Sequence, residues 1–200
     1  MKLIKNISKV ILISLILCLY AERSFSIGPD VFVQSTVNRA SEILGSSSSK
    51  QEKINGLKEI AKDTVDIKGI GYYTLGKHRK NINAEQLETY SQLFEKYFLK
   101  TFASRLAQYT NPEVKVDSSD KLNENYTMVH SHLIATEQRP KIQIDWRVHT
   151  KDPKNLMIRD LIIEGLSLAR TQKEEFNSII LNNNGNIDFL FISLNEFIKK

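Results

Sequence analysis

Two histidines, His130 and His132, are separated by one residue in a stretch where polar and apolar residues alternate. If this stretch is a β-strand, both imidazoles project from the same side of the sheet. A hairpin with the following stretch would place Asp145 opposite His132. Two imidazoles and a carboxylate can bind zinc or iron or act as acid–base groups. We favour the competing interpretation, a solvated sheet face with ordinary cross-strand neighbours, because no HExxH or comparable ligand spacing accompanies the histidines.

Other motifs that carry chemistry are missing from the sequence. It contains no nucleophile elbow, phosphate-binding P-loop or dinucleotide fingerprint. Gly69 and Gly71 have Gly-x-Gly spacing, but a third glycine and a preceding strand are lacking. The basic run from Lys77 to Lys80 follows Gly76, and we expect it to be a solvated loop near the end of a helix. Nothing in these motifs calls for a catalytic function.

A β-hairpin would position the histidines. Residues 126–136 and 142–149 both alternate, and residues 137–140 would connect them. A closing pair of Glu137 with Pro140 sets the register that places Asp145 opposite His132. It also collects the apolar residues on one face, namely Val129, Leu133, Ala135, Ile142, Ile144, Trp146 and Val148. Before the hairpin we expect a short strand at 113–116 and a polar loop at 117–125.

The remaining pattern predicts helices before and after an antiparallel sheet. Apolar stripes indicate helices at 29–44 and 51–64, a long helix from Asn83 to about Tyr109, and a last helix after Asn186. The segment 67–75 is ambiguous. Residues 156–163 predict another strand, after which Ser167 can cap a helix that carries Leu168 and Phe176. This order predicts an α+β fold.

The apolar sheet face must meet another apolar surface. The long helix carries five aromatic residues in one stripe, and we expect Phe94, Phe98 and Phe102 to face Trp146. One explanation is an ordinary core. The other is a cavity between sheet and helices that takes an apolar ligand. The pattern alone favours neither.

The first 26 residues have the layout of a secretory signal peptide. A basic start precedes the apolar run from Val10 to Leu19, which is shorter than the ~20 residues of a membrane-spanning helix. Removal of this segment would leave one domain, residues 27–200. The only cysteine, Cys18, would be removed with it, so the mature chain would have no disulfide. The net charge would fall from +5 to +2, which gives no compositional argument for nucleic-acid binding.

Four segments carry a resemblance to a known family: Tyr73-Thr74-Leu75-Gly76-Lys77, Asn83-Ala84-Glu85-Gln86 with Phe94, Ile144-Asp145-Trp146-Arg147, and the run from Asp160 to Leu168 with Phe176. From about Pro29 to Leu194 the chain resembles the MlaC family, the toluene-tolerance family of periplasmic phospholipid-binding proteins of Gram-negative bacteria. The Asp-x-x-x-Glu-Gly-x-Ser part is the most specific. Leu156 stands where the family usually has Trp, with a loss of aromatic volume, and Arg159 stands where it often has Tyr.

The resemblance implies an NTF2-like α+β fold, an antiparallel sheet packed against several helices around a deep apolar lipid pocket. The acyl chains would lie inside and the headgroup outside. The candidate pocket-lining residues are Tyr73, Phe94, Phe98, Val129, Leu133, Ile144, Trp146, Leu161, Ile163, Leu168 and Phe176. We expect weak headgroup preference, because no arginine cluster surrounds the apolar face.

The resemblance also implies a role in transport. The protein would shuttle phospholipid through the periplasm between an outer-membrane lipoprotein complex and an inner-membrane ABC transporter with a hexameric MCE-domain protein, maintaining outer-membrane lipid asymmetry. Phospholipid would be cargo, with no cofactor and no metal. The alternatives are an NTF2-like enzyme that uses His130, His132 and Asp145, and an interaction protein with a solid core.

Overall fold

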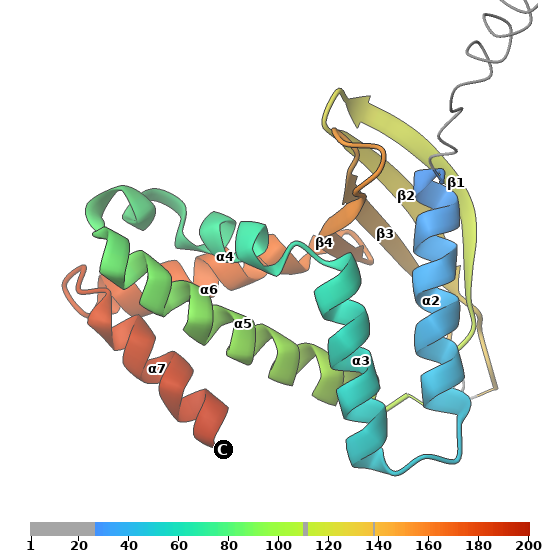
Figure 1. Cartoon of the computed structure of the whole chain (residues 1–200), viewed down its shortest axis with the longest axis horizontal. Helices are drawn as coiled ribbons and strands as arrows, with labels where there is room; N and C mark the ends of the chain where they lie inside the picture. Colours follow the sequence, from blue (N-terminus) through green and yellow to red (C-terminus); the bar gives the residue numbers. More distant parts are fainter. Residues whose placement is uncertain (1–26, 110–111, 138) are drawn as a thin grey trace, which may run out of the picture.

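The computed structural model describes residues 27–109, 112–137 and 139–200, so the expected signal peptide lies outside the described residues. Helices and one five-stranded antiparallel sheet of order β1-β2-β3-β4-β5 form the structure, which confirms the α+β prediction (Figure 1). The helices are α2 (Pro29–Gly45), α3 (Lys50–Thr64), α4 (Ile67–Leu75), η1 (Gly76–Asn81, a 3₁₀ helix), α5 (Ala84–Leu106), α6 (Leu168–Asn182) and α7 (Asp188–Lys199). The strands are β1 (Val114–Asn123), β2 (Tyr126–Leu133), β3 (Ile142–His149), β4 (Met157–Ile163) and β5 (Leu166–Ser167).

Capping side chains determine where several helices begin. Asn83 Oδ1 accepts the Gln86 N–H at 2.8 Å, and Gln86 Oε1 accepts the Asn83 N–H at 3.1 Å. Ser49 and Glu52 form the same reciprocal box at the start of α3. Such a cap contributes about 1 kcal/mol to the free energy of unfolding. The long helix α5 begins where the sequence predicts and ends three residues before the predicted Tyr109.

The β2–β3 hairpin has the predicted faces but not the predicted register. His130 lies opposite Asp145, and Leu133 lies opposite Ile142. The closing pair is Thr136 with Arg139, each accepting the other's N–H. The predicted closing pair was wrong because Pro140 has no N–H to donate. The pairing moved by two residues, which preserves side-chain parity, so Val129 and Trp146 still share a face.

The polar loop predicted at 117–125 is also wrong. These residues continue the edge strand β1, which runs as far as Asn123 and pairs with β2 along its length. Most of its side chains are exposed and polar. An edge strand tolerates this composition because its backbone pairs on one side and charged side chains face water. The polar composition therefore favoured a loop prediction where the structure has a regular strand.

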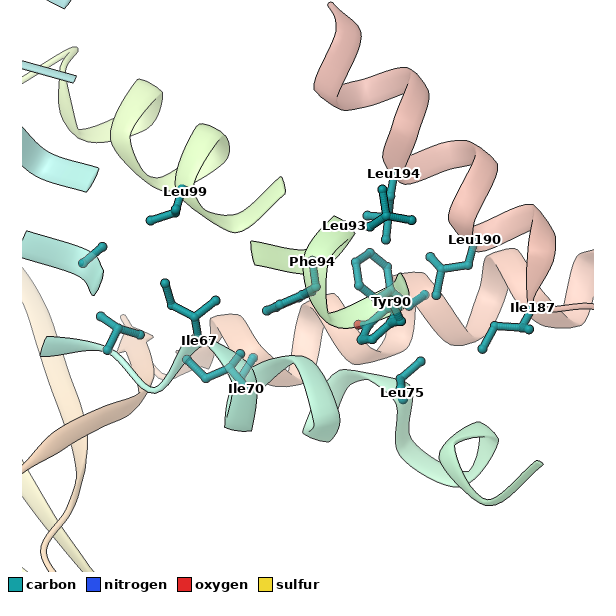
Figure 2. Close-up of a cluster of buried hydrophobic side chains, with 14 of the residues drawn as sticks. Ile67, Ile70, Leu75, Tyr90, Leu93, Phe94, Leu99, Ile187, Leu190 and Leu194 are labelled. Carbon is teal, nitrogen blue, oxygen red and sulfur yellow. The ribbon is translucent and has the colours of Figure 1, made fainter. Parts of the chain in front are cut away.

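Helices α4 to α7 enclose one hydrophobic cluster, which we call the helical core (Figure 2). Tyr90 of α5 is fully buried at its centre, and its hydroxyl lies 2.7 Å from the Thr74 hydroxyl of α4. Burial raises the pKa of the Tyr90 phenol. The Phe94 ring meets the Phe176 ring of α6 edge-on, with centroids 6.2 Å apart. Aromatic packing thus joins α5 to its neighbours.

A second cluster, the sheet core, lies between α2 and the sheet. It contains Val33 and Val37 of α2 with Val129, Val148 and Leu156. Helix α2 therefore covers this sheet face along β1 and β2, and the expectation that the long helix covers it was wrong (Figure 1). The aromatic stripe of α5 is used instead in packing against α4, α6 and α7.

Asp160 explains the most specific of the sequence motifs. Glu164 and Gly165 both have positive φ, 49° and 81°, and form the tight turn between β4 and β5. This turn brings Ser167 back beside Asp160, which is 3% exposed. Asp160 accepts the Ser167 hydroxyl at 2.6 Å and the Ala169 N–H at 3.0 Å. The motif therefore joins β4 to the start of α6.

Replacement of Asp160 with Ala should lower the free energy of unfolding by about 2–4 kcal/mol, because the partly buried Ser167 hydroxyl and the buried Ala169 N–H lose their acceptor. Urea unfolding followed by circular dichroism measures the change. The control is Glu174→Ala, an exposed position on α6, which should stay within about 0.5 kcal/mol of wild type. A loss below about 1 kcal/mol in D160A would contradict this role for the carboxylate.

Candidate functional site

Four apolar side chains of β3 and β4 form a continuous surface, which we call the apolar sheet face. Ile144 lies opposite Ile163, and Trp146 lies opposite Leu161. All four are only partly buried. Trp146 Nε1 donates to Ser131 Oγ at 2.8 Å, and the Ser131 hydroxyl donates to the Ile144 carbonyl at 2.8 Å. These bonds fix the orientation of the indole.

Trp146 lies where the two cores meet. Together with Phe32 of α2, it packs against both the helical core and the sheet core. We call this meeting point the seam. Ile144, Leu161 and Ile163 belong to none of the hydrophobic clusters found among the described residues. The apolar sheet face therefore extends beyond the packed interior.

The other predicted pocket residues lie in three places. Val129 and Leu133 are buried on the same sheet face as Trp146, at 0% and 4% exposure. Phe94 and Phe176 are buried in the helical core, and Phe98 packs against its edge. Tyr73 and Leu168 are exposed at the surface. The structure thus brings some of these residues together and separates others, and their pocket-lining role stays a prediction.

Two adjoining pockets open between α4 and the ends of β1 to β4. They have volumes of about 450 and 420 Å³, within the range of sites for small ligands. Gly69, Tyr73 and Arg159 line both, and we call them the paired pockets. The first is also lined by Asp66, Lys68, Tyr72 and Arg79, and the second by Ile70, Leu122, Asn123, Tyr126, Arg147 and Ala169.

Arg159 is the central charged group of the paired pockets. A β-bulge makes it the extra residue of β4, because Arg147 pairs with Asp160 and Val148 pairs with Ile158. Its Nη2 lies 2.5 Å from Asp66 Oδ2. The guanidinium packs so closely on Gly69 that a Cβ there would lie 2.8 Å from Cζ. A glycine is thus required at position 69 because the Arg159 guanidinium approaches the backbone so closely there.

Sequence reasoning missed this cationic site. Bulges are not visible in an alternating pattern, and the basic run was expected to be a solvated loop. It forms η1 instead, with Arg79 stacked over the Tyr72 ring at 4.3 Å. The one signal for this site in the sequence was Arg159 itself, which stands where the family often has Tyr.

The two histidines lie on the opposite, solvated face of the sheet. His130 lies 2.9 Å from Asp145 and 3.1 Å from Asp120, and His132 lies 2.7 Å from Asp117. Neither histidine lines the paired pockets. In the part of the chain that the structure describes, no three His, Cys, Asp or Glu residues are grouped to hold a metal. The arrangement corresponds to ordinary cross-strand neighbours.

Comparison with known proteins identifies the family. The family model described as MlaC protein matches residues 34–196. The chain belongs to the MlaC family. A relative in Haemophilus influenzae, the intermembrane phospholipid transport system binding protein MlaC, is 22% identical over 176 residues, which cover 84% of this chain and 81% of the relative.

A solved structure shares the fold of this MlaC-family chain. It is a phospholipid-binding protein from Ralstonia solanacearum, determined in complex with a phospholipid. The TM-score is 0.72 at 20% identity, with 86% of this chain and 98% of that chain covered. No helix within the described ranges is long and apolar enough to cross a bilayer.

His130 should give a small pH dependence of stability. Its hydrogen bond to Asp145, and next the one to Asp120, raise its pKa above the ordinary 6.5. A raised folded-state pKa stabilises the fold below about pH 6.5, and the contribution disappears as the pH rises through the folded-state pKa. The Tm difference between wild type and His130→Gln should therefore be larger at about pH 5.5 than at about pH 9, by a few degrees at most.

NMR titration checks the same assignment directly. The His130 imidazole should titrate above 6.5, whereas the His149 imidazole should titrate below 6.5 because burial, and next the charge of Arg159, lower its pKa. Asp145→Asn should move the His130 midpoint down and leave His149 in place. A His130 midpoint at or below 6.5 in wild type would show that the cross-strand pairs do not form.

Proposed function

We propose that this MlaC-family protein binds a phospholipid through its acyl chains and carries it between two membranes. The observation that carries the proposal is the apolar sheet face, on which Ile144, Leu161 and Ile163 are partly buried outside the packed clusters. Each buried CH₂ of an acyl chain contributes about 0.8 kcal/mol. An apolar surface that the chain's own core leaves partly uncovered can supply that burial.

The acyl chains would enter at the seam. Trp146 and Phe32 are the side chains that pack against both cores, so separating the cores disrupts few contacts within either one. The paired pockets have the size of sites for drug-sized ligands, and two acyl chains need more room. Binding therefore requires the apolar sheet face and the helical core to move apart, and a partner that widens the seam would promote release.

Membership of the MlaC family supports a transport route between the outer and the inner membrane. The cargo would be taken from, or delivered to, an outer-membrane lipoprotein complex and an inner-membrane ABC transporter with an MCE-domain protein. The protein would act in the periplasm after export. Carriage of this kind breaks no covalent bond. The enzyme alternative is not favoured, because His130 and His132 lie on the sheet face away from Trp146 and outside the paired pockets.

The mature protein, expressed in a Gram-negative host, should co-purify with about one diacyl phospholipid per chain. The physical reason is that acyl chains on the apolar sheet face dissociate into water only slowly. Native mass spectrometry gives the stoichiometry, and lipid extraction gives the identity. Protein that is repeatedly empty in such preparations would contradict the proposal.

Replacement of Ile144 with Asp should remove the lipid but leave the chain folded. The charge is placed on a partly buried surface, where water can reach it, so we expect a loss of roughly 1–3 kcal/mol in stability. Circular dichroism and lipid quantification on one sample separate folding from binding.

Two isoleucines provide matched controls. Ile180 is 0% exposed in the helical core, and Ile180→Asp should unfold the chain or cause aggregation. Ile192 is 51% exposed on α7, and Ile192→Asp should stay folded with its lipid. A folded I144D protein that retains its lipid would show that Ile144 does not contact the acyl chains.

A further inference from the structure

The paired pockets carry an excess of positive charge. Four cationic side chains line them, Lys68, Arg79, Arg147 and Arg159, against one carboxylate, Asp66. A fifth cation, Lys173, lies over the ring of Tyr73 at 5.0 Å. Such a surface attracts an anion.

The donors of the two strand arginines are only partly used. Arg159 has five N–H donors in a planar fork, and its Nε is buried with no acceptor among the described residues. The nearest carboxylate to Arg147 is Asp160, at 3.6 Å, and Asp160 already accepts from Ser167 and Ala169. Both guanidinium groups line the second pocket. Both guanidinium side chains are partly exposed, and their planar forks suit the oxygens of a phosphate group.

Asp66, by contrast, has both oxygens engaged within the protein. Its Oδ1 accepts the Gly69 N–H at 2.7 Å, and its Oδ2 is paired with Arg159. An ammonium group on a ligand would therefore meet four cations and one carboxylate whose charge is already paired with Arg159. A phosphate beside a neutral alcohol fits these pockets better than a phosphate beside an amine.

The floor of the second pocket connects this charge to the apolar interior. Ile70 and Ala169 line the pocket and belong to the helical core, against which Trp146 also packs. Arg147 lies on the sheet face opposite Trp146, so the link from the guanidinium groups to the apolar interior runs through Ile70 and Ala169. A phosphate at the guanidinium groups would have these apolar side chains beside it. This order of polar and apolar groups is that of a phospholipid.

We propose that the paired pockets bind the phosphate of the lipid headgroup through Arg159 and Arg147 and thereby favour anionic phospholipids over zwitterionic ones. The inference rests on the proposed function. It replaces the expectation of weak headgroup preference. That expectation was based on the residues around the apolar sheet face and did not include the bulge that brings Arg159 to the paired pockets.

The test is a competition between two headgroups. Lipid-stripped wild-type protein is mixed with vesicles of equal phosphatidylglycerol and phosphatidylethanolamine with identical acyl chains, and bound lipid is quantified. We expect phosphatidylglycerol to be enriched about fivefold or more, because both lipids offer the phosphate but the cations repel the ammonium group of phosphatidylethanolamine. In Arg159→Gln the enrichment should fall to about twofold or less, with the total bound lipid nearly unchanged.

Arg39→Gln is a matched control. Arg39 also forms an ion pair with one aspartate, Asp63, at 2.7 Å, but it lines neither pocket. The substitution makes the same change in net charge, and the enrichment should stay at the wild-type value. An equal loss in R39Q would show that overall charge, and not the pockets, selects the lipid.

Gly69→Ala tests geometry at constant charge. The added Cβ would lie 2.8 Å from Arg159 Cζ and 2.6 Å from Asp66 Oδ2, so it displaces the guanidinium. Alanine is the better helix former, so α4 should persist. The enrichment should fall at least twofold in G69A. An unchanged enrichment in both R159Q and G69A would overturn the inference.

A last arm distinguishes a headgroup site from a site for free phosphate. Inorganic phosphate at millimolar concentration should not displace bound phosphatidylglycerol, because acyl-chain burial contributes most of the affinity. Displacement of the lipid by phosphate would overturn the assignment to a headgroup. Lipid bound without headgroup preference would overturn the inference alone, whereas wild-type protein that binds no lipid would overturn the proposed function as well.

Discussion

Three consecutive residues of β4 attach the sheet to the helices, and the bulge between β3 and β4 makes this possible. The Ile158 carbonyl accepts the Asp66 N–H at 3.0 Å, and its side chain enters the helical core. Arg159, the bulged residue, pairs with Asp66 at the start of α4. Asp160 accepts from Ser167 and Ala169 at the start of α6. In a regular strand, side chains alternate and could not make these three contacts in succession.

The sequence predicted local features well, since they depend on neighbouring residues. The cap at Asn83, the faces of β2 and β3, and the helix after Ser167 follow from side-chain hydrogen bonding and from period-2 alternation. The predicted hairpin register was wrong because Pro140 has no backbone N–H to donate in the expected closing pair. Which helix covers the sheet could not be predicted, because the stripes of α2 and α5 are both apolar and tertiary packing decides between them.

The separation of the sheet core from the helical core suits a carrier. A chain of this size could bury its apolar residues in one core, but here Val33, Val37 and their partners pack separately from Tyr90, Phe94 and Phe176. Opening of the seam would leave most contacts within each core in place, and its cost would fall on Trp146, Phe32 and Ile158, the sheet residue buried in the helical core. The hydrogen bond from Trp146 to Ser131 holds the indole to the sheet, while Ile158, Arg159 and Asp160 keep β4 attached to the helices.

The two departures from the family pattern act on different parts of the molecule. Leu156 is 8% exposed in the sheet core, beside Val33 and Val129, so the smaller side chain is accommodated by packing with α2 and lies outside the paired pockets. Arg159 places a cation, in place of a phenol, at a position that lines both pockets. A tyrosine there could offer one hydroxyl, whereas the guanidinium pairs with Asp66 and has five N–H donors in all. The apolar sheet face and the paired pockets are thus set by separate residues of the sheet, and a change in one need not disturb the other.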